Sequence, residues 1–361
     1  MIQRLLLLPK INPEKITAVI RCLPKKPGII KELVDKALSG ESFNNIPEKL
    51  YQALFTKTAV FPSAKMGLLG NPDKLIISAD GACVVSNASP YGRKNCYCSA
   101  KCGCDKKFAD PNAGWGWDSY HQRWFYGYTA YLLSVNNNKL KIDLPVYLRF
   151  AEASAYDGVT LIPALAHAKS LFNGTFSFDS LIADAAHDNY PTYDLLKQWR
   201  IKPFIPLNSR NSSESGGKPV HLSGSGIPVC ADGYEMINWG FDAKRYRIKY
   251  RCPLITGRVK FCFFDSCCNK SLYGKSVYIN LAKDLRLFTP VPRDSTEWTD
   301  VYKLRSASER VNNRILTDYQ LERPKRYGKM KIAFFTFLNS INVHLDAQIR
   351  FNSVSLESLL S

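Results

Sequence analysis

The sequence predicts an α/β protein, because short apolar runs typical of buried strands alternate along the chain with segments of helical periodicity. Leu75–Gly81 and Leu181–Asp184 are such strands, and helices are expected over Gly158–Phe172 and Pro191–Trp199. Hydrophobic residues make up 45% and charged residues 22% of the chain, which excludes disordered, collagen-like and coiled-coil proteins. A length of 361 residues fits two or three units of about 150 residues, or one elaborated domain.

Residues 1–74 are expected to form a helical N-terminal region. Apolar residues recur at spacings of three and four in Pro13–Cys22 and Pro27–Leu38, and Pro47–Phe55 is a third candidate helix. Proline and glycine then recur between Pro62 and Pro72, which predicts a linker.

Residues 75–350 are expected to form the main domain, interrupted twice. Residues 82–122 are rich in Gly, Cys and Lys and are interpreted as an irregular insertion. Arg123–Ser134 and Leu144–Ala151 predict a pair of strands joined by a turn at residues 136–138, and Asp157 is expected to cap the helix that follows.

The second half of the chain contains a second, larger insertion. Ile201–Leu207 predicts an edge strand because it contains two prolines. Residues 208–295 are interpreted as a β-rich insertion, after which helices are expected at Val301–Leu316 and Ala333–Asp346. Residues 351–361 would be a C-terminal tail.

The charge of the chain indicates a polyanionic partner. The chain has 49 basic and 31 acidic residues, so 49 − 31 gives a net charge of +18. Such an excess favours nucleic acid over an anionic membrane surface. No run of about 18 apolar residues could span a membrane, and the apolar run Leu5–Leu8 is too short for a signal peptide. We therefore expect a cytoplasmic, nucleoid-associated protein without membrane contact.

Eleven cysteines in a reducing compartment indicate metal ligands or buried thiols before disulfides. Cys96, Cys98, Cys102 and Cys104 follow a C-x-C-x3-C-x-C pattern and could hold a structural zinc ion. Inert thiols in a variable insertion are an equally good interpretation. A looser second group, with lower odds of zinc, comprises Cys230, Cys252, Cys262, Cys267 and Cys268.

A basic and aromatic segment, Lys244–Cys252, could bind DNA. If the segment is a strand, alternation places four cations on one face, namely Arg245, Arg247, Lys249 and Arg251. Four cations in line can follow a phosphate backbone, but a solvated outer face of a sheet has the same pattern. Trp115, Trp117 and Trp124 could stack on bases, although packing of the insertion is the better interpretation.

Asp80 and Asp184 each end a short apolar run, and Glu309 lies on the helix that returns after the β-rich insertion. Carboxylates in this arrangement are the oxygen ligands that Mg²⁺ prefers. Other interpretations remain open, because Asp-Gly often marks a turn and Ser306-x-x-Glu309 is also a capping box. His187 and Asp188 could tune the metal ligands, or Asp188 could cap a helix.

These residues lie within longer motifs that resemble those of bacterial insertion-sequence transposases of the IS-four-like DDE type. The resemblance covers roughly residues 45–350 and is specific as a set. The motifs are Asp80–Cys83, Ala88–Gly92, Asp110–Ser119, Ile182–Asp188, Lys202–Asn208 and Tyr302-x2-Arg305-x3-Glu309-Arg310.

The resemblance implies an RNase H-like mixed sheet flanked by helices. It implies that Asp80, Asp184 and Glu309 bind two Mg²⁺ or Mn²⁺ ions and catalyse cleavage at element ends and strand transfer into target DNA. Tyr302 and Arg305 would hold a phosphate. The partners would be double-stranded DNA, at the inverted repeats and the target, and a second copy of the chain.

The sequence departs from the family in two respects. The helix of Glu309 often carries a lysine where this chain has Leu316, so Arg310 and Arg314 are the nearest cations. Only 79 residues precede Asp80, whereas the family commonly has a longer helical region there that recognises the ends of the element. A truncated gene is therefore one interpretation of this sequence. A DNA-binding remnant and a metal-dependent nuclease without strand transfer therefore remain as alternatives.

Overall fold

The computed structural model describes residues 27–43, 46–99, 102–118, 121–208, 223, 227–242, 244–245, 247–263, 272–280, 285–321 and 326–352. The helix expected at Pro13–Cys22 and residues 353–361 of the expected tail lie outside this set. The chain divides into two compact units, one of Met1–Ser177 with Ser306–Ser361 and one of Phe178–Arg305. None of the described helices combines the length and the apolar character that crossing a membrane requires.

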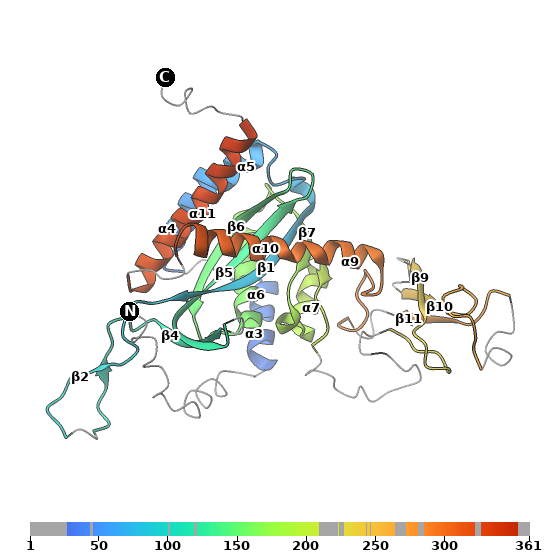
Figure 1. The fold of residues 1–361 in the computed structure, drawn as a ribbon, viewed down its shortest axis with the longest axis horizontal. Helices are drawn as coiled ribbons and strands as arrows, with labels where there is room; N and C mark the ends of the chain where they lie inside the picture. Colours follow the sequence, from blue (N-terminus) through green and yellow to red (C-terminus); the bar gives the residue numbers. More distant parts are fainter. Residues whose placement is uncertain are drawn as a thin grey trace. The chain divides into compact units, whose positions relative to one another are not determined.

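The first unit contains an antiparallel sheet built around one long strand (Figure 1). This strand, β5 (Arg123–Asn137), pairs with β1 (Leu75–Val85) on one edge and with β4 (Gly114–Asp118) and β6 (Ile142–Glu152) on the other. Most of its aromatic and β-branched side chains are buried, as expected for a strand covered on both faces. The predicted strand pair is confirmed, with its turn at residues 138–141.

Two expectations for this region are wrong. Strand β1 does not end at Asp80 but continues to Val85, and residues 82–122 are not irregular throughout, because β4 joins the sheet. Gly81 indicated a turn, yet it lies within the strand. A Cβ atom at Gly81 would lie 2.9 Å from Oδ1 of Asp157 and 3.0 Å from Thr129, so glycine is required by close packing.

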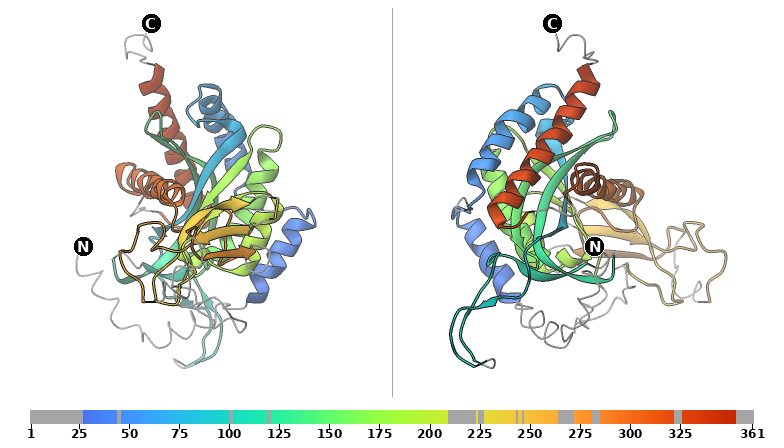
Figure 2. Two further views of the ribbon diagram at one scale, coloured as in Figure 1. Left: turned by 90° about the vertical axis from the view of Figure 1, so that its right-hand side faces the viewer. Right: turned by 60° about the vertical axis from the view of Figure 1, so that its left-hand side comes forward.

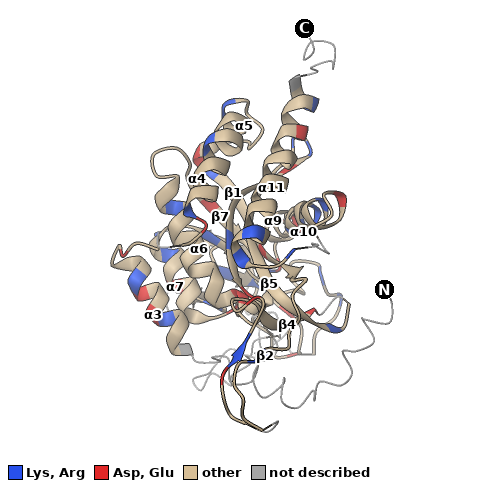
Figure 3. Cartoon of the chain, turned by 90° about the vertical axis from the view of Figure 1, so that its left-hand side faces the viewer, with Lys and Arg blue, Asp and Glu red and all other residues tan. Residues whose placement is uncertain are grey.

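A short hairpin projects from the segment between β1 and β4. Its strands are β2 (Arg93–Lys94) and β3 (Lys106–Lys107), and the segment of four cysteines connects them. Basic residues colour β2 in Figure 3. All four strand residues are exposed.

Helices cover the sheet of the first unit. Helix α3 (Pro27–Leu38) has the predicted bounds, whereas α4 (Lys49–Phe55) continues through the π-helical stretch η2 (Thr56–Val60) into α5 (Phe61–Lys65). Pro62 therefore does not begin a linker. It stands in the first turn of α5, where a missing N–H is tolerated.

Two further helices of this unit differ from expectation at their ends. Helix α11 (Lys329–Asn352) is longer than predicted and lies beside α4, where the rings of Tyr51 and Phe334 are 5.5 Å apart (Figure 2). Helix α6 (Asp157–Leu171) begins at Asp157 itself, so Asp157 is not its cap. The N-cap residue is Tyr156, and among the described residues no side chain provides a capping hydrogen bond there.

The second unit contains a parallel strand pair and a separate small sheet. Strand β7 (Phe178–Ile182) runs parallel to β8 (Lys202–Phe204), with α7 (Tyr190–Gln198) between them in sequence. Strand β8 is shorter than the expected Ile201–Leu207. The antiparallel order β11–β10–β9 joins β11 (Ser276–Asn280), β10 (Arg247–Arg251) and β9 (Ile237–Asp242), and its core comprises Ile227, Met236, Ile248, Tyr250 and Phe288.

The helix predicted at Val301–Leu316 begins earlier and is interrupted. Helix α9 (Thr296–Tyr302) leads into the 3₁₀ turn η6 (Lys303–Arg305), then α10 (Ser306–Asn313) and the π-helical η7 (Arg314–Asp318). The chain is thus an α/β protein with both parallel and antiparallel strand pairs and flanking helices.

Candidate active site and nucleic-acid interface

Asp80 lies in the middle of β1, on the face that α10 covers. Ser78 and Asp80 are two residues apart and so share one face of the strand. The Ser78 hydroxyl donates to the Ser308 hydroxyl at 3.0 Å, and the Asn312 side-chain amide donates to Oδ2 of Asp80 at 2.9 Å. Because Ser308 and Asn312 are one helical turn apart, α10 runs along the strand at this point.

Asn312 has an unsatisfied oxygen beside Asp80. Its amide nitrogen bonds to Asp80, while its Oδ1 is buried and has no hydrogen-bond partner among the described residues. A flipped amide would bring Oδ1 against the Asp80 carboxylate, so the hydrogen bond to Asp80 fixes the orientation of the amide. A buried amide oxygen without a donor is suited to a hard cation. No role was predicted for Asn312 from the sequence.

Glu309 occupies the first turn of α10, three residues before Asn312, and is exposed. Residues three apart are neighbours on a helix surface, so Glu309 lies next to the residue that contacts Asp80. The 3₁₀ turn at Lys303–Arg305 separates Tyr302 from Glu309 within the single helix that was predicted over Val301–Leu316. The position of Glu309 in a first turn is also the one that the capping-box alternative gave it.

In the second unit, Asp184 follows β7 and begins the 3₁₀ turn η4 (Ala185–His187). Its Oδ1 accepts hydrogen bonds from the Ala186 backbone N–H at 3.1 Å and from Nδ1 of buried His187 at 2.6 Å. Burial raises the pKa of Asp184, but the His187 hydrogen bond and charge, the Ala186 N–H and the Arg305 charge outweigh it and lower the pKa. Asp184 is therefore an anion at neutral pH.

Asp188 holds this turn in place and is not the N-cap of the helix that follows. Its buried carboxylate pairs with the Arg286 guanidinium, whose Nε donates to Oδ1 at 2.9 Å and whose Nη2 donates to Oδ2 at 2.6 Å. It also accepts hydrogen bonds from the Tyr193 hydroxyl and the Asn208 N–H. The cap of α7 is Asn189. A buried bidentate pair is costly to break, so Asp188 and Arg286 stabilise the segment that carries Asp184.

The other cations predicted near the site pair with carboxylates of the protein. Arg310 bonds to Asp143 and to Ser306, and Arg314 pairs with Asp346 at 2.7 Å. A phosphate at either arginine would compete with these partners. In the second unit, the ring of Tyr302 stacks on that of Trp298 at 4.6 Å, which orders the end of α9.

The small sheet of the second unit presents cations beneath aromatic rings. Arg251 lies 3.7 Å from the centre of the Tyr273 ring and 4.2 Å from that of Trp239, and Arg247 lies 4.2 Å from that of Tyr278. The ammonium of Lys249 donates to the Tyr273 hydroxyl at 2.5 Å, which raises the pKa of Lys249. We name these six residues the cation–aromatic face.

The cation–aromatic face differs from the predicted row of four cations. Arg245 lies in the turn before β10, and Arg251 is only 8% exposed because the rings cover it. Trp239, Tyr273 and Tyr278 are 49%, 44% and 47% exposed. The opposite face, with Ile248 and Tyr250, is buried. Exposed rings over cations suit stacked bases with nearby phosphates.

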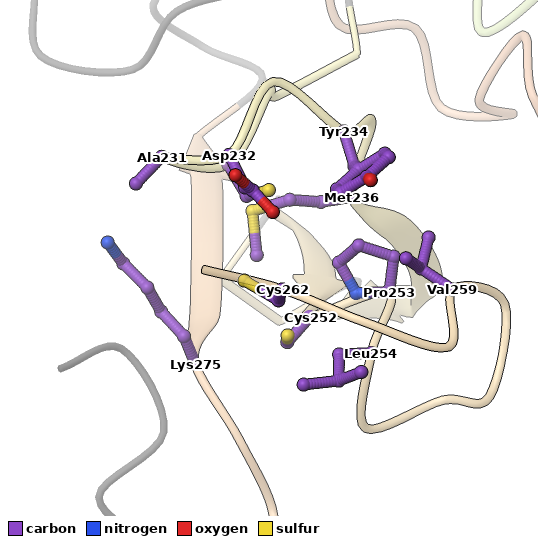
Figure 4. Close-up of a pocket in the computed structure, with 11 residues that line it drawn as sticks. Ala231, Asp232, Tyr234, Met236, Cys252, Pro253, Leu254, Val259, Cys262 and Lys275 are labelled. Atoms are coloured by element: carbon purple, nitrogen blue, oxygen red, sulfur yellow. The ribbon is translucent and has the colours of Figure 1, made fainter. Parts of the chain in front are cut away.

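The cysteine groups differ in geometry. The Sγ atoms of Cys96, Cys98, Cys102 and Cys104 all lie within 4.8 Å of one another, which is close enough to hold a metal ion. The described members of the second group form no such cluster. Cys252 and Cys262 instead line a small pocket with Met236 and Leu254 (Figure 4), while Cys267 and Cys268 lie outside the described residues.

The residues of the expected metal site are divided between the units, Asp80 and Glu309 in the first and Asp184 in the second. No model of a known protein family matches the sequence, and no curated protein matches it.

Proposed function

We propose that the protein is a DNA transposase of the DDE type, with an RNase H-like catalytic domain. Asp80, Asp184 and Glu309 would hold two Mg²⁺ or Mn²⁺ ions, and Asn312 would add an oxygen ligand. The observation that carries the proposal is the contact of α10 with β1, where the Asn312 amide binds Asp80 and leaves Oδ1 free.

The donor atoms at this contact fit the proposed ions. They are carboxylate and amide oxygens, which Mg²⁺ and Mn²⁺ prefer, and no thiol or imidazole is among them. The lowered pKa of Asp184 keeps the third carboxylate ionised and able to bind a cation. Bound ions would activate a water and neutralise the charge that develops at the phosphate.

The reaction has two steps. A water oxygen attacks phosphorus at the element end, and the bond from phosphorus to the 3′ oxygen breaks. The released 3′-hydroxyl then attacks phosphorus in a phosphodiester of the target, and the bond from that phosphorus to the target's 3′ oxygen breaks, which leaves a 3′-hydroxyl on the target strand. Two copies of the chain would bring both element ends together.

Binding of DNA is supported by the net charge of +18 and by the cation–aromatic face. A phosphate close to Asp184 would also meet Arg305, because the charge of Arg305 already lowers the pKa of Asp184. The guanidinium can donate two parallel hydrogen bonds to one phosphate.

Metal-dependent nicking and joining of DNA that carries the element's ends test the proposal. We expect the wild type to nick DNA with Mg²⁺ or Mn²⁺. The nicking rate of Asp184→Ala should be lower by more than about 100-fold, which is the effect of removing one group that stabilises the charge of a transition state. Asp194→Ala, which removes an exposed carboxylate from α7, is the matched control and should nick normally.

Each other outcome has a distinct meaning. Nicking without joining would indicate a nuclease without strand transfer. Binding of DNA without nicking would indicate a non-catalytic DNA-binding remnant, and the absence of a basic residue at position 316, which is Leu316, would then explain the loss of activity. Unchanged nicking by Asp184→Ala would remove Asp184 from the site.

A further inference from the structure

We propose that Cys96, Cys98, Cys102 and Cys104 bind one zinc ion through four thiolates and so close the tip of the β2–β3 hairpin. The Sγ atoms of Cys96 and Cys102 are 3.3 Å apart, and those of Cys98 and Cys104 are 3.8 Å apart. A tetrahedral site with Zn–S bonds of about 2.3 Å places the sulfur atoms about 3.8 Å from one another. The four side chains therefore already have nearly the spacing that zinc requires.

The same distances argue against disulfides. A disulfide bond is about 2.05 Å long, and all four cysteines are free thiols in the structure. Both close sulfur pairs belong to one group of four, so a single ion can bind all four sulfur atoms. Soft thiolates select zinc over the hard cations proposed for the oxygen ligands around Asp80, so the two metal sites are chemically independent.

The hairpin needs a cross-link because its strands repel each other. Arg93 lies directly opposite Lys107, and Lys94 lies opposite Lys106, so both cross-strand pairs join like charges. Such pairs destabilise a hairpin, and a ladder of two residues a side is too short to fold alone. The strand residues are exposed and contribute no core.

Other features of the hairpin bring its two sides together at the base and at the tip. A Cβ atom at Gly92 would lie 2.5 Å from Cβ of Lys106, so glycine allows the chain to approach β3 there. At the tip, the Lys94 ammonium donates to the backbone carbonyl of Ser99 at 3.0 Å. The thiolates lie between these points, where a bound ion would join both sides of the loop. Free energy of zinc binding becomes folding free energy in such small sites.

Metal analysis of the full-length protein tests the proposal. Protein purified under reducing conditions should contain one zinc ion and no iron per chain. Cys96→Ser plus Cys98→Ser should lose the zinc, whereas Cys230→Ser plus Cys262→Ser, which changes two half-buried cysteines of the other group, should keep it. Cobalt(II) in place of zinc should give the absorption of a tetrahedral thiolate site in the wild type and in the second variant but not in the first.

A further variant separates loss of a ligand from loss of folding. Cys104 is exposed, so Cys104→His can supply an imidazole ligand without crowding and should keep the zinc, whereas Cys104→Ser should bind it more weakly. The proposal is wrong if wild-type protein holds no zinc while its thiols react freely or are oxidised to disulfides. It is also wrong if zinc content is unchanged in the Cys96 and Cys98 variant.

Discussion

His344 is a buried neutral imidazole with a partner on each nitrogen. Its Nδ1 accepts a hydrogen bond from the Ser63 hydroxyl at 2.8 Å, and its Nε2 donates to the carbonyl of Pro145 at 2.6 Å. Burial lowers the pKa of His344 from 6.5 to about 4. The unfolded chain therefore takes up a proton at a higher pH than the folded chain does.

We expect the free energy of unfolding to fall as the pH falls from 6.5 to about 4 and to level off below that range. Since the folded pKa lies below the unfolded value, the contribution of the neutral form to stability is complete above the unfolded pKa and is lost as the pH falls to the folded pKa. The difference in pKa corresponds to about 3 kcal/mol. Urea unfolding between pH 7 and 4 measures it. His344→Gln should show a shallower pH dependence, and an unchanged slope would contradict this origin.

Asn312 provides the second prediction at this scale. Asn312→Ala removes both the hydrogen bond to Asp80 and the free Oδ1. If Oδ1 supports a cation, half-maximal nicking should require about 10- to 100-fold more Mg²⁺. Asn313→Ala, which truncates the exposed neighbouring residue, should leave the Mg²⁺ dependence unchanged. Equal Mg²⁺ requirements of wild type and Asn312→Ala would exclude a ligand role.

Residue types that carry obvious chemistry were predictable from the sequence, whereas their partners were not. Asp184 and His187 were expected to interact, and they do. The partner of Asp188 is Arg286, which lies far along the chain, and no local pattern links the two. Asn312 was given no role because amides are common on helix surfaces. Only its place opposite Asp80 distinguishes it.

Among the strands, β5 tolerates no side chain at Gly127. This glycine pairs with Val85 of β1 and with Gly114 of β4. A Cβ atom would lie 2.1 Å from the carbonyl oxygen of Val84 and 2.8 Å from the Ser86 nitrogen, and these backbone atoms cannot move without loss of pairing. Gly127→Ala should therefore lower the free energy of unfolding by about 1–3 kcal/mol or more.

A glycine on a helix provides the control for this substitution. A Cβ atom at Gly28 of α3 meets nothing within 4 Å. Gly28→Ala should raise the free energy of unfolding by up to about 1 kcal/mol, because alanine favours helix. Denaturant titration of both variants measures these differences, and a Gly127→Ala protein as stable as the wild type would show that the end of β1 can shift.

The cation–aromatic face predicts how DNA affinity depends on its residues. Trp239→Ala should weaken binding of single-stranded DNA by about 1–3 kcal/mol through lost stacking. Lys249→Ala should lower the slope of log K against log salt concentration by about 0.7, as expected for one phosphate contact. Lys31→Ala, which removes an exposed cation from α3, is the charge-matched control. Affinity that responds equally to Lys31 and Lys249 would indicate a diffuse electrostatic effect.

Elements with a regular hydrophobic pattern along their whole length were predicted, whereas elements in which this pattern is interrupted were not. Strands β5 and β6 and helix α3 were predictable because propensity and burial agree along their whole length. Strand β4 was overlooked because glycine separates its two tryptophans. The 3₁₀ turn at Lys303–Arg305 leaves no trace in the spacing of apolar residues.

At the scale of the whole molecule, composition and element order predicted an α/β protein, and the structure confirms that class. The pairing of β5 with β6 was predicted, but its pairing with β1 and β4 was not. Strand β4 lies beside β5 although it belongs to the segment interpreted as an insertion. Pairings of this kind depend on contacts that local patterns do not encode.

The distance along the chain between β1 and β5 has a consequence for folding kinetics. These strands pair through Val85 and Gly127, so residues 86–122 must be looped out, whereas β5 and β6 join through a tight turn. The β5–β6 hairpin should form first, and docking of β1 must then overcome the entropy of closing the long loop.

A zinc ion bound by the four cysteines would cross-link the hairpin Arg93–Lys107 and so shorten the loop that must close when β1 pairs with β5. Shortening the loop in this way should speed refolding about twofold. Stopped-flow refolding with zinc or with a chelator, followed by tryptophan fluorescence, measures this. The Cys96 and Cys98 variant should refold at one rate in both solutions. A metal ion bound at the β2–β3 hairpin would then set the rate at which β1 joins the sheet.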